Sequence, residues 1–552
     1  MPSLSNLQAV PDFLKREDVR SRLFYAVLFA ILAVQLWAAL VNIHFGIDSI
    51  QMMSVFESDE TAAVARTQKN LAEGDLSPDG MFQYGFFFNT LAYWSIRFFQ
   101  FLDYNRDTTV SFLAINYRLI TVFSFLLLLF FFQRLSLLLV ESRELSWLAV
   151  LLLASVQQIY YWSQTIHPDI TQTLLIVAAA WVAMKTHTFR NANWAAFLAG
   201  MAFGTKYGGI FILPFLFIPA LLNDRPEISL AGKLRGKALP FLLCFLLGWL
   251  IFNPYVIFNF IHFVRWLKLI VMYTLTGFVG STGQITSANP LLWFPVLYRS
   301  FFPSGALVLL AGLLPALWFL VRAMKRKEGL REPNMLNRIV IGAYCLFALL
   351  YILLGVKSRE VRYAFHLIPF LILLSFIGWS ILSRQMKEQG RAFLFFALLI
   401  LIVPANLNAV HSMASCSNKE SDARLASGRV LEERYSPDTR ILADFYAYVP
   451  PKFKNTLIEW GIRSESINRD NPQVIILSRA MTGRWIWKAP GTSFSDGSFV
   501  TNPSYPEEQL RSGRDVFSTL FGKSSAPYRP VYEDEHVLIL ERRNLPEGKD
   551  QP

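Results

Sequence analysis

The chain has 552 residues, of which 53% are apolar and 17% charged, and it contains 48 Phe and 14 Trp. This composition lies far outside that of soluble globular proteins and indicates a polytopic membrane protein. The net charge of +12 does not point to nucleic acid, because the basic residues form no single patch or binding motif and instead fill short loops. Three cysteines, Cys244, Cys345 and Cys416, are too few for a disulfide framework.

The N-terminal arm, residues 1–20, is polar, and the apolar run that follows is long enough to span a membrane. We therefore expect a retained signal anchor rather than a cleaved signal peptide. A hydrocarbon core about 30 Å thick requires about 20 helical residues, so the shorter apolar segments must tilt or include flanking residues. The apolar segments are 21–43, 85–102, 117–134, 146–162, 169–185, 193–205, 207–222, 238–258, 304–322, 336–355, 362–382 and 391–409.

The loops predict the orientation. Four loops are basic and are expected on the cytoplasmic side: 184–194, 223–237, 322–334 and 383–391. Counting back from them places 133–146 inside and 163–170 outside. The basic N-terminal arm is also expected inside. The orientation counted forward from this arm agrees with the one counted back from the basic loops only if segment 85–102 does not span the membrane. We therefore predict that this aromatic segment lies in the outer interface or re-enters the membrane, and that roughly eleven segments span it.

The expected domains are the arm 1–20, a transmembrane catalytic domain 21–409 with its first outer loop at 44–116, and a non-cytoplasmic domain 410–552. In the last of these, short apolar runs between Pro, Gly, Ser and Asn indicate strands of a small soluble α/β domain. One alternative remains open within the membrane domain. The close pair 193–205 and 207–222 could be a single kinked element.

The first outer loop contains an acidic cluster within "VFESDETAAVARTQKNLAEGDL", residues 55–76. One interpretation is a helix start, with Ser58 or Asp59 as the cap and Glu57 and Glu60 favoured by the helix dipole. The other is that Asp59 is a catalytic carboxylate, with Glu60 as its neighbour, at the outer mouth of a membrane cavity. The second interpretation depends on what else lies on the outer face.

Another candidate is "IHPDI", between two predicted spans on the outer side. Pro168 could simply start the next helix with Asp169 in its first turn. His167 and Asp169 could equally bind a polar ligand. Asp59, Glu60, Asp169 and His167 on one face permit a divalent metal ion, but no ligand spacing requires one.

Cations also gather at the outer span ends, against the positive-inside bias. They are Lys206 in "GTKYGG" and, in "VKSREVRYAFHLIP", Lys357, Arg359, Arg362 and His366. For any one of them an ion pair with a nearby carboxylate would suffice as an explanation. For the whole set of cations, a bound phosphate is a simpler explanation than separate ion pairs, because Arg offers a bidentate fork and Lys a point charge. At another outer span end, "FNPYV" is more typical of a structural turn.

The sequence resembles the GT-C superfamily of integral-membrane glycosyltransferases, especially the protein O-mannosyltransferase and aminoarabinose-transferase type. The resemblance rests on four motifs and on their order along the chain. The motifs are "DETAAVARTQKNLAEGD" from Asp59, "HPD" at 167–169, "GTKYG" at 204–208 and "RYAFHLIP" at 362–369. The resemblance covers essentially the whole membrane region. The chain departs from closer relatives in "FQYGFFFNTLAYW", which lacks a basic residue and a proline pair ahead of the second segment.

This resemblance implies a GT-C fold and a polyprenyl-phosphate sugar donor, with inverting transfer to a hydroxyl of a lipid, glycan or protein. It places the protein in a bacterial inner membrane with its site on the periplasmic face, and it requires no cofactor. Because phosphate leaves without a general acid, one carboxylate base with cationic stabilisation should suffice. The expected catalytic residues are Asp59, Glu60 and Asp169, and the expected substrate-binding residues are His167, Lys206, Tyr207, Arg359, Arg362 and Tyr363.

Two other functions are compatible with the hydropathy. A secondary transporter would also have about a dozen apolar segments, although repeated halves are typical of transporters and no repeat is visible. The second alternative function is that of an inactive membrane anchor whose C-terminal domain binds a partner. The sugar and the acceptor are not determined by the sequence.

Overall fold

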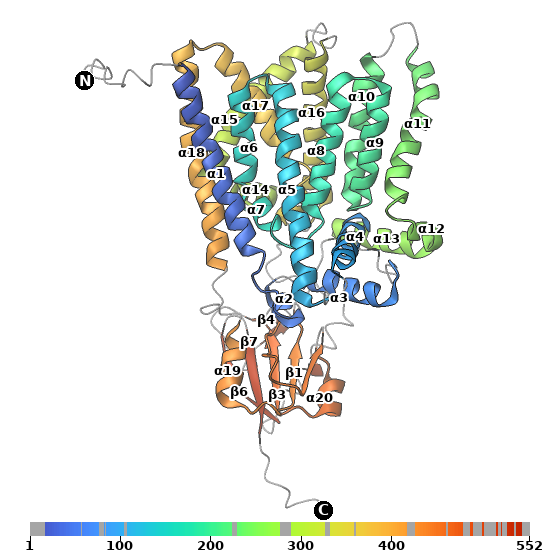
Figure 1. Cartoon of the computed structure of the whole chain (residues 1–552), viewed down its shortest axis with the longest axis vertical. Helices are drawn as coiled ribbons and strands as arrows, with labels where there is room; N and C mark the ends of the chain where they lie inside the picture. Colours follow the sequence, from blue (N-terminus) through green and yellow to red (C-terminus); the bar gives the residue numbers. More distant parts are fainter. Residues whose placement is uncertain are drawn as a thin grey trace, which may run out of the picture.

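The structure, a computed structural model, describes residues 17–56, 58–76, 82, 84–103, 108–223, 229–276, 289–325, 332–357, 360–416, 425–459, 462–478, 486–488, 499–501, 515–516, 520, 527–534 and 537–543. Long helices run side by side in a bundle, and a small sheet domain lies beyond one end of it (Figure 1). We call this end the sheet-domain end and the other the opposite end. The polytopic fold predicted from composition, with a C-terminal α/β domain, is confirmed.

The bundle is built from long, mostly apolar helices that run between its two ends (Figure 1). By length and composition, five stretches of the described residues could each cross a membrane: Arg22–Asn42, Val110–Val140, Phe302–Lys325, Pro333–Gly355 and Glu388–Met413. The predicted number of spans, roughly eleven, stays a prediction. The bundle helices are α1 (Glu17–Asn42), α5 (Val110–Val140), α6 (Arg143–Ala154), α8 (Asp169–Thr186), α9 (Phe189–Phe203), α10 (Leu213–Asn223), α11 (Leu230–Leu250), α15 (Phe302–Lys325), α16 (Pro333–Leu350), α17 (Ile368–Arg384) and α18 (Glu388–Cys416).

Shorter elements join these helices, and several of them gather at the sheet-domain end (Figure 1). They are α2 (Ile50–Phe56), α3 (Ser58–Glu73), α4 (Phe87–Leu102), α7 (Gln157–Trp162), α12 (Tyr255–Phe258), α13 (Phe260–Thr276) and α14 (Trp293–Ser300). The turns between helices include η3 (Tyr207–Ile212), η4 (Pro290–Leu292), η6 (Tyr351–Gly355) and η7 (Val361–Ala364). Most of the residues that the sequence singles out lie in or beside these elements.

Helix α4 is the aromatic segment that was expected outside the bundle, and it lies at the sheet-domain end beside α3 (Figure 1). One face, with Phe88, Ala92 and Ile96, is buried in a cluster with α3 and α5. Trp94 and Phe101 on the other side are 62% and 85% exposed. An amphipathic helix of this kind suits a membrane interface.

Helix α13 was not predicted, because basic residues interrupt its apolar pattern. Phe263 and Trp266 face the protein, whereas Ile261 and Val264 are exposed. His262, Arg265 and Lys268 recur at every third position along it. The helix therefore combines a lipid-facing stripe with a basic one, as interfacial helices do.

The pair 193–205 and 207–222 forms separate elements rather than one kinked helix. Helix α9 ends at Phe203, and Lys206 lies in the turn before η3 and α10. This turn is at the sheet-domain end, as predicted for "GTKYGG" (Figure 1).

Helices α15 and α17 pack with their backbones in close approach at two glycines. A Cβ atom on Gly378 would lie 1.9 Å from the carbonyl oxygen of Gly312. Gly378→Ala is therefore expected to lower the free energy of unfolding by about 1 to 3 kcal/mol, the usual cost of overpacking, measured by denaturant unfolding in detergent. Gly390→Ala in α18 is the matched control, because its nearest neighbour would be Met386 Cβ at 3.5 Å. Equal stability of the two variants would contradict this packing.

The sheet domain begins after α18, which continues past the predicted boundary to Cys416. Its five-stranded sheet has the order β2-β1-β3-β7-β6, with β1, β2 and β3 parallel and β7 antiparallel to both β3 and β6. Predicted apolar runs form β1, β3 and β7, all buried over their first four residues. The elements are α19 (Ala426–Arg434), β1 (Ile441–Asp444), β2 (Thr456–Glu459), α20 (Ser464–Asp470), β3 (Val474–Ser478), β4 (Ile486–Lys488), β5 (Phe499–Thr501), β6 (Tyr528–Glu533) and β7 (Val537–Arg542).

Candidate functional site

Five of the residues predicted from sequence meet at the sheet-domain end of the bundle. Asp59 lies in the first turn of α3, and Asp169 is the first residue of α8. His167 precedes α8, Lys206 follows α9, and Arg362 lies in η7. Each residue stands at the start of a helix, in a short turn or in a 3₁₀ segment, where side chains can converge.

Asp59 pairs directly with one of the cations of the site. Its Oδ2 accepts a hydrogen bond from Nη1 of Arg362 at 2.8 Å and lies 3.4 Å from Nε2 of His167. Glu360 forms a second ion pair with Arg362, through Nε. Within the described residues no hydrogen bond reaches the other oxygen, Oδ1, of Asp59. That oxygen can accept a proton from a ligand.

His167 connects Asp59 to a second ion pair. Its Nδ1 lies against the Asp169 carboxylate, whose other oxygen is 2.6 Å from Nζ of Lys206. Gln172, one turn into α8, donates to the carbonyl of Lys206 at 2.5 Å and fixes the turn. The order of contacts is therefore Arg362, Asp59, His167, Asp169 and Lys206.

The position of Asp169 determines what His167 can do. A carboxylate beside Nδ1 favours a proton on that nitrogen, which leaves Nε2 to face both Asp59 and Nη1 of Arg362, the latter at 3.2 Å. Burial lowers the pKa of His167, but Asp169 and Asp59 raise it above its ordinary value of 6.5. The protonated ring donates to Asp59, whereas the neutral ring accepts from Arg362.

The same contacts act on Asp59. Burial raises its pKa, but the hydrogen bond from His167 and the charge of Arg362 outweigh burial and hold the pKa below its ordinary value of 3.8. Asp59 is therefore ionised at neutral pH. With these partners in place, however, its affinity for a proton is low.

Exposure separates the residues that a ligand can touch from those that it cannot. The side chain of Asp59 is 34% exposed, and those of Lys206 and Arg362 are each 17% exposed. His167 and Asp169 are both 1% exposed. Asp59 and two cations therefore face outward together with Glu360, which is 22% exposed and paired with Arg362, and a buried His–Asp pair supports them from behind.

Glu60 points away from Asp59 into the protein. Its side chain is fully buried, and its two oxygens accept from Nε and Nη2 of Arg118 at 3.0 and 2.5 Å. The backbone N–H of Ile166 donates to the same carboxylate at 2.6 Å. Arg118 also donates to the carbonyls of Ile43 and Phe45, at 3.0 and 2.6 Å. Glu60 thus joins α3, α5 and the turn that carries His167.

Aromatic rings surround the charged residues, and two of the three were not predicted from the sequence. Lys206 Nζ lies 5.7 Å from the ring centre of Tyr84 and 5.4 Å from that of Tyr363. The Arg362 guanidinium lies over Trp162, whose ring centre is also 4.5 Å from that of His167. Tyr363 was expected from the motif. Tyr84 and Trp162 lie in aromatic stretches, where no local signal distinguishes them.

Tyr84 is positioned by backbone pairing between its own loop and the turn that carries Lys206. The N–H of Gly85 donates to the carbonyl of Thr205 at 3.1 Å, and that of Phe87 donates to Gly204 at 3.1 Å. A Cβ atom on Gly85 would lie 1.9 Å from the carbonyl oxygen of Gly204. Glycine at position 85 is therefore required for this approach.

Two other candidates have structural partners. The hydroxyl of Tyr207 donates to the carbonyl of Phe82 at 2.7 Å. Asn253, from "FNPYV", accepts from the N–H of Phe86 at 2.6 Å and donates to the carbonyl of Trp249, which agrees with the turn that was favoured there. Arg359 and Glu57 lie outside the described residues.

Comparison with solved structures shows which architecture this is. ArnT from Cupriavidus metallidurans bound to undecaprenyl phosphate matches over 97% of this chain and 100% of that chain, with a TM-score of 0.50 and 13% identity. The membrane domain has the GT-C fold. The expectation drawn from the four motifs is thereby confirmed at the level of the fold.

Another GT-C structure is similar over much of its length. The archaeal oligosaccharyltransferase AglB from Archaeoglobus fulgidus, in complex with an inhibitory peptide and a dolichol-phosphate, matches over 92% of this chain and 79% of that chain, with a TM-score of 0.48 and 12% identity. No family model and no curated protein sequence matches the chain. Because one fold serves many reactions, the activity has to be argued from the site.

Proposed function

We propose that this GT-C protein is a membrane glycosyltransferase that moves a sugar from a polyprenyl phosphate to a hydroxyl acceptor. The observation that carries the proposal is the outward-facing set of Asp59, Arg362 and Lys206 at one end of an apolar bundle. A carboxylate can take the proton of an attacking hydroxyl, and two cations can hold a departing phosphate. ArnT, whose fold this chain shares, binds undecaprenyl phosphate, which supports a donor of this class.

In the proposed reaction the acceptor oxygen attacks the anomeric carbon while the bond from that carbon to the phosphate oxygen breaks. The acceptor proton passes to Oδ1 of Asp59, and the negative charge that develops on the phosphate is held by Arg362 and Lys206. A single direct displacement inverts the anomeric centre. We propose that no metal is required, since the two cations balance the charge of the leaving group.

The ion pairs of the site have a role in this scheme. Asp59, Asp169 and Glu360 are paired with Arg362 and Lys206, so an incoming phosphate must exchange with a carboxylate. When phosphate takes Arg362, one of the two contacts that lower the pKa of Asp59 is lost while the hydrogen bond from His167 remains, and the proton affinity of Asp59 rises. Asp59 therefore becomes a stronger base when the donor is bound.

The deep burial of three other predicted residues supports a role in positioning the groups that contact substrate. Glu60, Asp169 and His167 are too deeply buried to reach a substrate, which favours positioning over the catalytic role expected for Glu60 and Asp169. Tyr363 and Tyr84 flank Lys206 and would hold its ammonium group toward the phosphate. We place the site on the periplasmic face of a bacterial inner membrane, because the basic loops lie at the opposite end.

The direct test is transfer by the purified protein in nanodiscs. A panel of polyprenyl-phosphate monosaccharides is offered with lipid, glycan and peptide hydroxyl acceptors, and products are identified by mass spectrometry. Transfer from at least one donor supports the proposal. Uptake of a solute into vesicles without transfer from any donor would instead support the transporter.

Lys206→Met is expected to lower transfer by about 10²-fold or more, because it removes one charge opposite the leaving phosphate. The Met side chain keeps the approximate length and apolar contacts of Lys206. Steady-state kinetics with the active donor measure the effect, and Lys357→Met, just beyond η6, is the control. Equal activity of Lys206→Met and the wild-type protein would remove Lys206 from the mechanism.

A further inference from the structure

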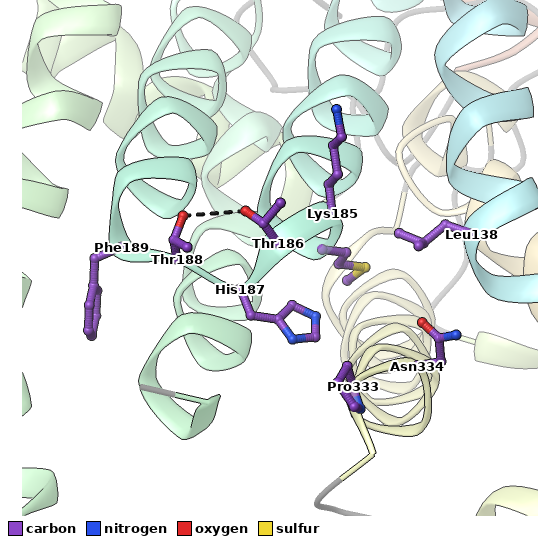
Figure 2. A pocket seen from close by; sticks show the side chains of 9 residues that line it. Leu138, Lys185, Thr186, His187, Thr188, Phe189, Pro333 and Asn334 are labelled. Atoms are coloured by element: carbon purple, nitrogen blue, oxygen red, sulfur yellow. Dashed lines mark hydrogen bonds between the residues drawn. The ribbon is translucent and has the colours of Figure 1, made fainter. Parts of the chain in front are cut away.

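A cavity of about 460 Å³ lies at the end of the bundle opposite to the candidate site (Figure 2). Lys185 on its wall is in the last turn of α8, while Asp169 in the site begins that helix. An 18-residue helix is about 27 Å long, so the cavity is separate from the site. It is lined by Leu138, Met184, Lys185, Thr186, His187, Thr188, Phe189, Pro333 and Asn334. We propose that this cavity binds the headgroup of an anionic phospholipid.

The walls of the cavity are held in place by hydrogen bonds between helices. Asn337, which is fully buried, donates to the carbonyl of Met184 at 3.1 Å, and its Oδ1 lies 2.7 Å from Nε2 of His187. Asn334 donates to Glu141 at 2.7 Å. His187 caps α8 in the left-handed conformation, with φ of 52°. These contacts join α5, α8 and α16 around a preformed space.

The cavity presents positive charge that is not balanced from within. Lys185 is exposed and forms no ion pair with any residue in the described ranges; its ammonium lies 5.1 Å from the Trp181 ring. A second cation, Lys237 of α11, lies over the Phe189 ring on the cavity wall. The nearby Glu141 is already paired with both Arg338 and Arg384. An anionic group in the cavity would therefore meet Lys185 once its ammonium turned from the Trp181 ring toward the cavity.

Backbone and hydroxyl groups add donors for phosphate oxygens. Pro333 is the first residue of α16, and the side chain of the preceding Glu332 makes no capping hydrogen bond. Because proline has no N–H, the donors at this helix start are the N–H groups of Asn334 and Met335. Thr186 and Thr188, whose hydroxyl oxygens are 3.4 Å apart, face each other across the turn between α8 and α9 (Figure 2).

A lipid headgroup fits this site better than free phosphate. Leu138, Met184 and Phe189 give the cavity an apolar side, which phosphate alone would leave unused but a glycerol and the start of its acyl chains would cover. The cavity also lies where apolar helices end among basic loops, at the level expected for headgroups. Neutral His187, whose pKa is lowered by burial, leaves Lys185 as the charge that selects an anionic lipid.

Native mass spectrometry of the full chain tests the proposal, with short-chain phosphatidylglycerol compared with phosphatidylcholine. We expect preferential phosphatidylglycerol adducts and about fivefold weaker binding in Lys185→Ala, equivalent to about 1 kcal/mol for one basic residue at a membrane surface. Arg322→Ala is the matched control, because that side chain also lies over a tryptophan, Trp318, at the end of a long helix but does not line the cavity.

The outcomes separate the possible ligands. Loss of phosphatidylglycerol binding in Lys185→Ala but not in Arg322→Ala supports the proposal. Equal losses in both variants would show general charge attraction and overturn it, as would no loss in Lys185→Ala. Full displacement of the lipid by millimolar inorganic phosphate would make free phosphate the ligand and would also overturn it.

Discussion

Asp59→Asn should lower kcat for sugar transfer by a factor of about 10² to 10⁴, the usual contribution of a positioned general base. The amide keeps the shape of the side chain and can still accept a hydrogen bond from Arg362, but it cannot take a proton from the acceptor hydroxyl. The KM for the donor should stay the same or fall, because Arg362 no longer shares its charge with a carboxylate. Steady-state transfer by purified protein in nanodiscs measures both quantities.

Asp75→Asn is the control, because it also removes one carboxylate and Asp75 lies just beyond the end of α3, the helix that begins with Asp59 in its first turn. Asp75 accepts a hydrogen bond from the Tyr255 hydroxyl at 2.6 Å and is not part of the charged cluster. Its transfer rate should remain within about twofold of wild type, since changes at exposed polar positions are small. If the folded Asp59→Asn protein transferred sugar at the wild-type rate, Asp59 would not be the base.

The second large effect is on stability. Arg118→Gln should lower the free energy of unfolding by about 3 to 5 kcal/mol, because Glu60 would keep a buried charge without its counter-ion. Arg97→Gln on the neighbouring α4 is the control: Arg97 donates to the Leu71 carbonyl and to Gln100 but pairs with no buried carboxylate among the residues that the structure describes. Its loss should cost less than about 1 kcal/mol.

Denaturant unfolding in detergent measures these differences, and a double variant refines the interpretation. Glu60→Gln combined with Arg118→Gln should recover part of the lost stability, since no uncompensated charge remains. A destabilisation by Arg118→Gln no larger than that of Arg97→Gln would show that the pair does not anchor α3. Failure of the double variant to recover would assign the loss to the carbonyl contacts of Arg118 instead.

Sequence reasoning located the charged members of the site because order and topology carry that information. His167, Lys206 and Arg362 stand at ends of apolar segments and Asp59 lies in the first outer loop, and alternating spans bring such positions to one face. The loops also predicted that α4 would lie outside the bundle. None of this requires knowledge of where a side chain points.

What the sequence could not show depends on direction in three dimensions. Asp59 and Glu60 are neighbours, yet a rotation of about 100° along the helix sends one outward and the other into the protein. The partner of Glu60, Arg118, is hidden at the start of an apolar segment. Helix α13 was missed because His262, Arg265 and Lys268 dilute its hydropathy, although their spacing on one side of a helix was visible.

The distances in sequence between the paired charges also set an order for biosynthesis. Glu60 and Arg118 are 58 positions apart, so this pair can form while most of the chain is still untranslated. Asp59 and Arg362 are 303 positions apart. At about 5 to 20 residues per second, the ribosome takes about 15 to 60 s longer to deliver Arg362 than Asp59. In a nascent chain, the Glu60–Arg118 pair can therefore hold α3, which carries the proposed base Asp59, in place well before Arg362 arrives to complete the site.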